Sequence, residues 1–279
     1  MAGQEVWQGT PWMHAEPGYV PPKIDTSRPN VARVYDAILG GKDNFAADRE
    51  VAEMAHKAFP DGGRAAHVNR DLLGRAVRYM AAQGIIQFLD LGCGLPTVEN
   101  THQIAQAVNP DARVVYVDND PVVLAHGRAR LADRASTAIV AADLREPDEL
   151  WSAPEIAGFL ELTKPVGLIA NAVIHYVPDE EDPHGIISRY KELLAPGSCL
   201  LLTHFSNSCA EARALEEVLL STLGCGQLRT TEEITQFFDG LDIVQPGIGW
   251  LPDWHPDEPR QASSGISELL YIGGLGCKL

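Results

Sequence analysis

Acidic residues stand at the ends of three successive apolar stretches, where their carboxylates are placed to bind a polar ligand. The first stretch, residues 85–91, contains Asp90 and runs into the turn Gly92–Gly94, while the next two end at Asp118 and Asp143. The carboxyl ends of parallel strands are where open α/β sheets bind ligands. An acid after the second strand is suited to accepting both hydroxyls of a ribose, and the glycines allow a sharp turn beside the ligand.

The elements that must position these acids are strands alternating with helices. Apolar runs predict buried strands at residues 85–91, 113–118, 137–142, 166–173, 199–205, 241–244 and 269–275. Pro96 is typical of a first helical turn, so we expect a helix over 97–108 directly after the glycine turn. This alternation predicts an α/β fold: a seven-stranded, mostly parallel Rossmann-like sheet with helices on both faces. The last two strands are expected as a hairpin-like pair at the sheet edge.

Two classes of cofactor fit a glycine turn followed by acids. Dinucleotides favour a third glycine for the pyrophosphate, but Thr97 stands at that position. The set of residues resembles the Rossmann-like S-adenosylmethionine-dependent methyltransferases instead. That resemblance implies that Gly92 and Gly94 border the methionine part of the cofactor, with Asp90 behind the turn. It implies that the ribose and adenine are bound by the remaining residues Asp118, Asn119, Asp143 and Leu144.

A second resemblance lies nearer the N-terminus. The stretch Arg33–Arg49, RVYDAILGGKDNFAADR, is similar to the signature of an uncharacterised family of S-adenosylmethionine methyltransferases. This resemblance extends from about Ile24 to the C-terminus and implies methyl transfer without naming an acceptor. It adds four expected cofactor-binding residues, which are Tyr35, Gly40, Lys42 and Asn44. The spacing of the residues alone is equally consistent with a helix C-cap followed by an N-cap.

Arg70 lies on a predicted helix over 64–83, ahead of the first strand. Carboxyl methyltransferases that act on leucine termini resemble this region in placing an arginine at a similar distance before the glycine turn. The resemblance implies that Arg70 binds the carboxylate of the cofactor, since a guanidinium matches a carboxylate with two hydrogen bonds. A helix-surface role is the alternative reading.

Side chains after the fourth and fifth strands are placed to face an acceptor. Asn171 can bind the amino group of the cofactor, and His175 and Tyr176 are the first candidates for a general base. His204, at the end of the fifth strand, is a second base candidate. A histidine beside a strand end is more often a packed, hydrogen-bonded residue.

Composition limits the partners. The 279 residues contain 22 Lys and Arg against 38 Asp and Glu, a net charge of −16. We therefore predict no nucleic-acid or membrane partner, because both need clustered cations. No early apolar segment or membrane span is evident, which predicts a cytoplasmic protein. The five cysteines lack metal-site spacing, so we predict no metal, and we expect Cys93 and Cys199 to be buried free thiols.

The expected organisation is an extended arm over residues 1–24 and one methyltransferase domain over 25–279. Within that domain, residues 25–84 form a helical cap and 85–279 a Rossmann-like core. The predicted function is methyl transfer from S-adenosylmethionine to a small-molecule acceptor. A non-catalytic S-adenosylmethionine-binding module and an NAD-binding oxidoreductase are the alternatives. The sequence leaves homo-oligomer formation open.

Overall fold

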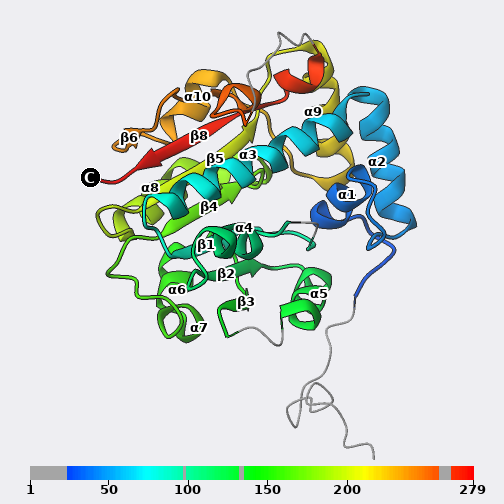
Figure 1. The fold of residues 1–279 in the computed structure, drawn as a ribbon. Helices are drawn as coiled ribbons and strands as arrows, with labels where there is room; N and C mark the ends of the chain where they lie inside the picture. The colour runs from blue at the N-terminus through cyan, green and yellow to red at the C-terminus, as the bar shows by residue number, and fades with distance from the viewer. Residues whose placement is uncertain (1–23, 97–98, 132–134, 258–264) are drawn as a thin grey trace, which may run out of the picture.

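An eight-stranded sheet forms the centre of the molecule in our computed structural model, which describes residues 24–96, 99–131, 135–257 and 265–279 (Figure 1). Its strand order is β3-β2-β1-β4-β5-β8-β6, with β7 paired to β8. The strands are β1 (Gln87–Leu91), β2 (Arg113–Asp118), β3 (Thr137–Ala141), β4 (Gly167–Asn171), β5 (Cys199–Phe205), β6 (Asp242–Ile243), β7 (Gly249–Trp250) and β8 (Tyr271–Cys277). Strands β1 to β5 are parallel and β8 is antiparallel to its neighbours, which confirms the predicted mostly parallel Rossmann-like sheet.

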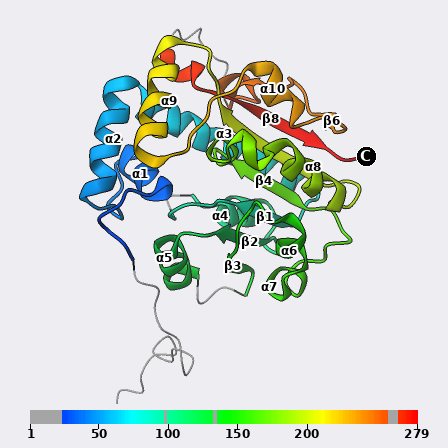
Figure 2. The same ribbon diagram turned by 180° about the vertical axis from the view of Figure 1, so that it is seen from behind.

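Helices cover both faces of the sheet, as predicted. Figure 1 shows α3 and α4 across one face, and Figure 2 shows α6 and α8 across the other. The α-helices are α1 (Val31–Ile38), α2 (Ala46–Ala58), α3 (Gly62–Ala82), α4 (Thr101–Val108), α5 (Pro121–Leu131), α6 (Pro147–Ser152), α7 (Pro154–Ala157), α8 (Pro183–Leu193), α9 (Ala210–Leu223) and α10 (Thr231–Gln236). Short 3-10 helices are η2 (Ile174–Tyr176), η3 (Asp179–Glu181), η4 (Leu251–Asp253) and η5 (Ile266–Leu269).

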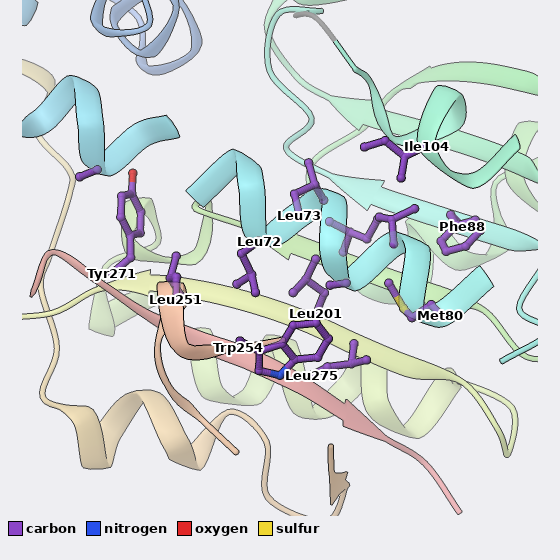
Figure 3. Packing of buried hydrophobic residues seen from close by; sticks show 14 of the residues in the cluster. Leu72, Leu73, Met80, Phe88, Ile104, Leu201, Leu251, Trp254, Tyr271 and Leu275 are labelled. Carbon is purple, nitrogen blue, oxygen red and sulfur yellow. The ribbon is translucent and has the colours of Figure 1, made fainter. Parts of the chain in front are cut away.

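The alternation of side chains along β1 divides the core into two layers. Phe88 packs in the same cluster as Leu72 and Met80 of α3 (Figure 3), whereas Leu89 and Leu91 pack on the opposite face. Because both faces are covered by helices, every residue of this strand is buried. Burial on both faces therefore fixes the register of β1 in the sheet. That register determines the position of the glycine turn at its carboxyl end.

The N-terminal helices α1 and α2 gather with α9 at one end of the sheet (Figures 1 and 2). Helix α1 begins at Val31, because the Asn30 side chain accepts hydrogen bonds from the backbone nitrogens of Ala32 and Arg33. These helices lie beside the carboxyl ends of the strands, so the residues of α1 can reach a ligand bound there. The predicted arm of residues 1–24 falls almost wholly outside the described residues.

The helix expected directly after the glycine turn begins later than predicted. Helix α4 begins at Thr101, and Pro96 lies in a preceding loop. Asn100 and Gln103 form the cap, with the backbone nitrogen of Asn100 donating to the Gln103 side chain at 2.8 Å. A capping box satisfies free N–H groups at its own position, and here it outweighs the preference of proline for a first turn.

Strand β8 and the loop before it correct one expectation and complete the core. Cys199 is not a free thiol: it forms a disulfide with Cys277, because the β5–β8 register places the two residues opposite each other. The loop around Trp254 packs in the core beside Leu201 and Leu275 (Figure 3). Arg75 of α3 donates hydrogen bonds to the carbonyl oxygens of Leu251 and Trp254, which holds this loop beneath the helix.

Candidate cofactor cavity

A cavity of about 300 Å³ opens at the carboxyl ends of β1 to β4. Strand order reverses between β1 and β4, and such switch points are where open α/β sheets leave a crevice. Ten of the predicted cofactor-binding residues line the cavity, together with Tyr176: Tyr35, Arg70, Asp90, Gly92, Gly94, Asp118, Asn119, Asp143, Leu144 and Asn171. The strand ends thus bring together residues that are far apart in the sequence.

The glycine turn packs closely against Val173, which follows β4. Gly92 has φ +62°, and a Cβ added there would lie 2.3 Å from Val173 Cγ2. Any other residue would collide with Val173 and would strain the left-handed backbone. Gly94 also has a positive φ, +65°, and its N–H donates a 2.9 Å hydrogen bond to Asp118. The turn after β1 is therefore tied to the end of β2.

The two strand-end acids are buried and bound differently. Asp118, 8% exposed, accepts hydrogen bonds from the backbone nitrogens of Gly94 and Asp120, and burial raises the pKa of its carboxyl. Asp90, 6% exposed, accepts a 2.7 Å hydrogen bond from the Thr101 hydroxyl. Burial raises the pKa of Asp90 to about 6. A carboxylate has about four acceptor sites, so both acids keep capacity for a ligand.

Two arginines, Arg70 and Arg145, line the cavity. Arg70 donates to the carbonyl of Glu99, and its charge acts to lower the pKa of Asp90 against the larger effect of burial. Arg145, which the sequence analysis did not select, pairs with Asp143 and with Glu181 at 2.7 Å. Hydrogen bonds from Arg145 hold the pKa of Asp143 below its ordinary value. Asp143 is therefore ionised and held in place at the cavity edge.

The end of β4 is held by a hydrogen-bond network centred on Thr203 of β5. The Thr203 hydroxyl lies 2.7 Å from Asn69 Oδ1 and 3.1 Å from Asn171 Oδ1, and it accepts from the backbone nitrogen of Ala172 at 2.8 Å. Ala172 lines the cavity with φ +57°, a strained conformation for a residue with a side chain. Such strain is common in functional sites, and the network keeps Asn171 at the cavity wall.

The three residues predicted as possible general bases do not lie together in the cavity. Tyr176 lines the cavity, but His175 and His204 lie outside its described lining. His175 is 1% exposed and stacks on the Phe205 ring, with centroids 3.7 Å apart. His204 is fully buried between the Phe205 carbonyl and Arg229. Burial lowers the pKa of both histidines, so they are neutral core residues, and their placement argues against either acting as a base.

Three residues of the N-terminal signature also lie outside the cavity lining: Gly40, Lys42 and Asn44. Asn44 instead donates hydrogen bonds to Asp36 and to the Gly41 carbonyl, while Lys42 is exposed. The signature has a structural role here, since Asp36 also accepts from the backbone nitrogen of Asp43. The helix-capping reading of this turn describes these contacts better than ligand binding.

A buried ion pair of the signature holds Asn30, which lines the cavity. Asp48, fully buried, pairs with Arg33 at 3.0 Å and accepts from the backbone nitrogen of Asn30. Asn30 and the first residues of α1 line the cavity, a contribution that the sequence analysis missed. The cap at Asn30 predicts the helix but not which of its ends faces a ligand. Cys225, after α9, also lines the cavity, and no sequence signal pointed to it.

A family model described as S-adenosyl methyltransferase matches residues 18–279. The chain belongs to this S-adenosyl methyltransferase family. It is thus an S-adenosylmethionine-dependent methyltransferase, as the glycine turn and the strand-end acids predicted. No match was found among the curated proteins.

Solved structures agree with membership of the methyltransferase family. A candidate methyltransferase from Thermobifida fusca YX is 43% identical, with 94% of this chain and 99% of that chain covered, at a TM-score of 0.89. A DUF574 family protein from Streptomyces avermitilis MA-4680 is 38% identical, with 92% and 100% covered, at a TM-score of 0.88. Within the described residues of this methyltransferase, no helix has the length and apolar character needed to span a membrane.

The cavity has the chemistry that S-adenosylmethionine requires. Two backbone N–H groups hold the Asp118 carboxylate in place at the end of β2, with acceptor capacity left for ribose hydroxyls. A Cβ at Gly92 would collide with Val173, so only a glycine fits in the turn beside the cavity. The residues present therefore fit this cofactor.

Proposed function

We propose that this methyltransferase binds S-adenosylmethionine in the cavity at the β1–β4 switch point and methylates a small-molecule acceptor. The observation that carries the proposal is the convergence of Asp90, Gly92 and Asp118 at the ends of β1 and β2. When bound, S-adenosylmethionine supplies an electrophilic methyl group on a sulfonium sulfur. The cytoplasmic location and homo-oligomer formation stay predictions, which cell fractionation and light scattering test.

Each residue has an assigned task in this proposal. Asp118 accepts the ribose hydroxyls, with Asn119 beside it, and Asp143 with Leu144 faces the adenine. Arg70 binds the carboxylate of the methionine part, and Asp90 with Asn171 receives its amino group. An ionised Asp90 stabilises a cationic amino group, so its raised pKa falls when the cofactor binds. The residues of the signature act by holding α1 against the cavity.

The contribution of the chain to catalysis is alignment. Tyr35 and Tyr176 line the cavity, and burial raises the pKa of both phenols, so they donate hydrogen bonds and do not remove protons at neutral pH. We therefore assign Tyr176 a hydrogen-bonding role, and a general-base role for it stays a prediction from the sequence. Holding two reactants in line supplies up to roughly 7–11 kcal/mol in ideal cases. Exclusion of water by α1 strengthens the electrostatic contacts inside.

Isothermal titration with S-adenosylmethionine, S-adenosylhomocysteine and NAD tests the cofactor site. We expect the two adenosyl compounds to bind and NAD not to bind. Thermal unfolding gives a second readout, because a ligand at 100 times its Kd adds roughly 2.7 kcal/mol. Binding of NAD alone would contradict the proposal. Binding of the adenosyl compounds without any turnover across a broad acceptor panel would favour the non-catalytic alternative.

A further inference from the structure

A second cavity, of about 590 Å³, lies between the N-terminal helices and α9. It is within the range of small-molecule sites, roughly 300–1,000 Å³. Helices α1, α2 and α9 contribute to its lining, together with the start of α3 and residues of β5 and β8. Among the described residues, Tyr35 and Tyr176 are the two that line both this cavity and the cofactor cavity. The two cavities are therefore neighbours, with two phenol rings between them.

The lining of the second cavity is mainly apolar and rich in rings. Phe59, Phe205 and Tyr271 contribute aromatic surface, and the Phe205 and Tyr271 centroids are 4.8 Å apart. Leu215 and Leu219 of α9 add aliphatic surface. Exposed polar side chains form the rim: Arg49, Glu53, His56 and Arg64. A matching occupant has an apolar, ring-bearing body, since such a body makes dispersion contacts with the aromatic rings of the lining.

The side chains shared by the two cavities are phenols, and the Tyr35 hydroxyl donates a 3.3 Å hydrogen bond to the Ala66 carbonyl. Both phenols carry their protons at neutral pH, and burial raises the pKa of Tyr35 and Tyr176 further above the ordinary value. The neighbouring His175 is sealed behind Phe205 and reaches neither described lining. His56 lines only the second cavity and is exposed on α2. An acceptor that is already ionised needs no base at this point. The phenols stabilise it by donating hydrogen bonds, which for Tyr35 replaces its bond to the Ala66 carbonyl.

We propose, resting on the function proposed above, that the second cavity binds the methyl acceptor and that this acceptor is an apolar, ring-bearing carboxylic acid. Its carboxylate faces Tyr35 and Tyr176, and its body lies between α2 and α9. One carboxylate oxygen forms a bond to the methyl carbon as the carbon–sulfur bond breaks, and that bonding electron pair stays on sulfur. The products are a methyl ester and S-adenosylhomocysteine. No proton is released in this step, so the reaction needs no general base beside the two phenols.

The experiment uses tritium-labelled S-adenosylmethionine and matched probes. The acids are 3-phenylpropanoic, 2-naphthylacetic and 4-biphenylacetic acid, and each is paired with the corresponding primary alcohol. We expect at least one acid to accept label that mild alkali releases as methanol, and we expect no labelling of the alcohols. With saturating cofactor, the rate should change less than twofold between pH 6.5 and pH 9, because the acids are ionised throughout.

A matched pair of α2 variants tests the location. Ala52 lines the second cavity and not the first, so Ala52→Phe fills acceptor space and should lower kcat/KM for the acid at least tenfold. Glu50 is exposed on the same helix and lines neither cavity, so Glu50→Phe should stay within twofold of the wild type. Both variants should keep the wild-type Kd for S-adenosylmethionine, which shows that they fold.

The outcomes separate this inference from the proposed function. Alkali-stable label, equal labelling of the alcohols, no labelling of any acid, or an unaffected Ala52→Phe variant would overturn the inference while cofactor binding persists. A failure of the wild-type chain to bind S-adenosylmethionine would instead overturn the proposed function on which the inference rests.

Discussion

The Oδ2 atom of Asp118 lies 2.9 Å from the backbone nitrogen of Gly94 and accepts its hydrogen bond. This contact joins the end of β2 to the turn after β1, so one acid both shapes the glycine turn and faces the cavity. The two tasks are linked, because a carboxylate held by backbone N–H groups is fixed before a ligand arrives. Such preorganisation reduces the entropy lost on binding.

Replacement of Asp118 by alanine should weaken cofactor binding. A hydrogen bond to a charged group contributes about 1.5–3 kcal/mol, so loss of the ribose contacts should raise the Kd for S-adenosylmethionine at least tenfold. Isothermal titration measures this change. The control is Asp111→Ala, at an exposed position of a turn. Equal affinities for the two variants would show that Asp118 does not bind the cofactor.

Replacement of Gly92 by alanine should cost stability through a clash, and the clash has an identified partner. The new Cβ would lie 2.3 Å from Val173 Cγ2. We expect a loss of about 1–3 kcal/mol, the cost of overpacking, in urea unfolding. The second substitution Val173→Ala should restore part of that loss. Gly94→Ala is the control, because nothing lies within 4 Å of its added Cβ, and only its left-handed backbone is strained.

Cofactor affinity should fall in acid because of Asp90. Burial raises its pKa to about 6, and the cationic amino group of the cofactor binds the ionised form. Below pH 6 the Kd should therefore rise by about tenfold per pH unit, in titrations from pH 5 to pH 8. Asp90→Asn should bind weakly at every pH, without this dependence. A wild-type Kd that is constant from pH 5 to pH 8 would contradict the assignment.

The same group predicts how the ligand-free stability changes with pH. The folded-state pKa of Asp90 is above its ordinary value of 3.8, so its contribution to stability is present below pH 3.8 and is lost as pH rises through 6. Asparagine does not ionise, so Asp90→Asn abolishes this decrease in stability with rising pH. Above pH 6 the variant should be more stable than the wild type by up to about 3 kcal/mol in urea unfolding.

Asp48 should be the most sensitive residue of the N-terminal signature. It is fully buried, and it accepts from Arg33 and from the backbone nitrogens of Asn30 and Phe45. Removing one partner of a buried ion pair costs about 3–5 kcal/mol, so Asp48→Ala should lower the urea midpoint strongly. Glu50→Ala, exposed on the same helix, should unfold like the wild type. A small effect at Asp48 would show that the pair is dispensable.

The sequence was most informative where a pattern repeats locally. The apolar runs of β1, β2 and β5 are encoded by adjacent residues, and these strands were predicted. The acids at the strand ends could be grouped because parallel strands align their carboxyl ends. Contacts that depend on packing could not be read this way. Nothing local distinguishes His175, stacked on Phe205, from a histidine that faces a ligand.

Long-range pairing explains the remaining differences. Cys199 and Cys277 meet only because β8 runs antiparallel beside β5, a register that neither segment encodes alone. Arg145 reaches Glu181 across two loops, and Cys225 enters the cavity from the turn after α9. Each of these contacts is set by the tertiary arrangement of the elements and not by a local sequence pattern.

The position of β8 in the sheet constrains the order of assembly. Strand β6 precedes β8 in the chain, yet it lies outside β8 at the sheet edge. A nascent chain leaving the ribosome therefore presents β6 before the strand that it must pair with exists. Until β8 joins β5, the fully buried β5 is an open edge, and open edges are where chains aggregate. Completion of the sheet must therefore wait until β8 has been synthesised.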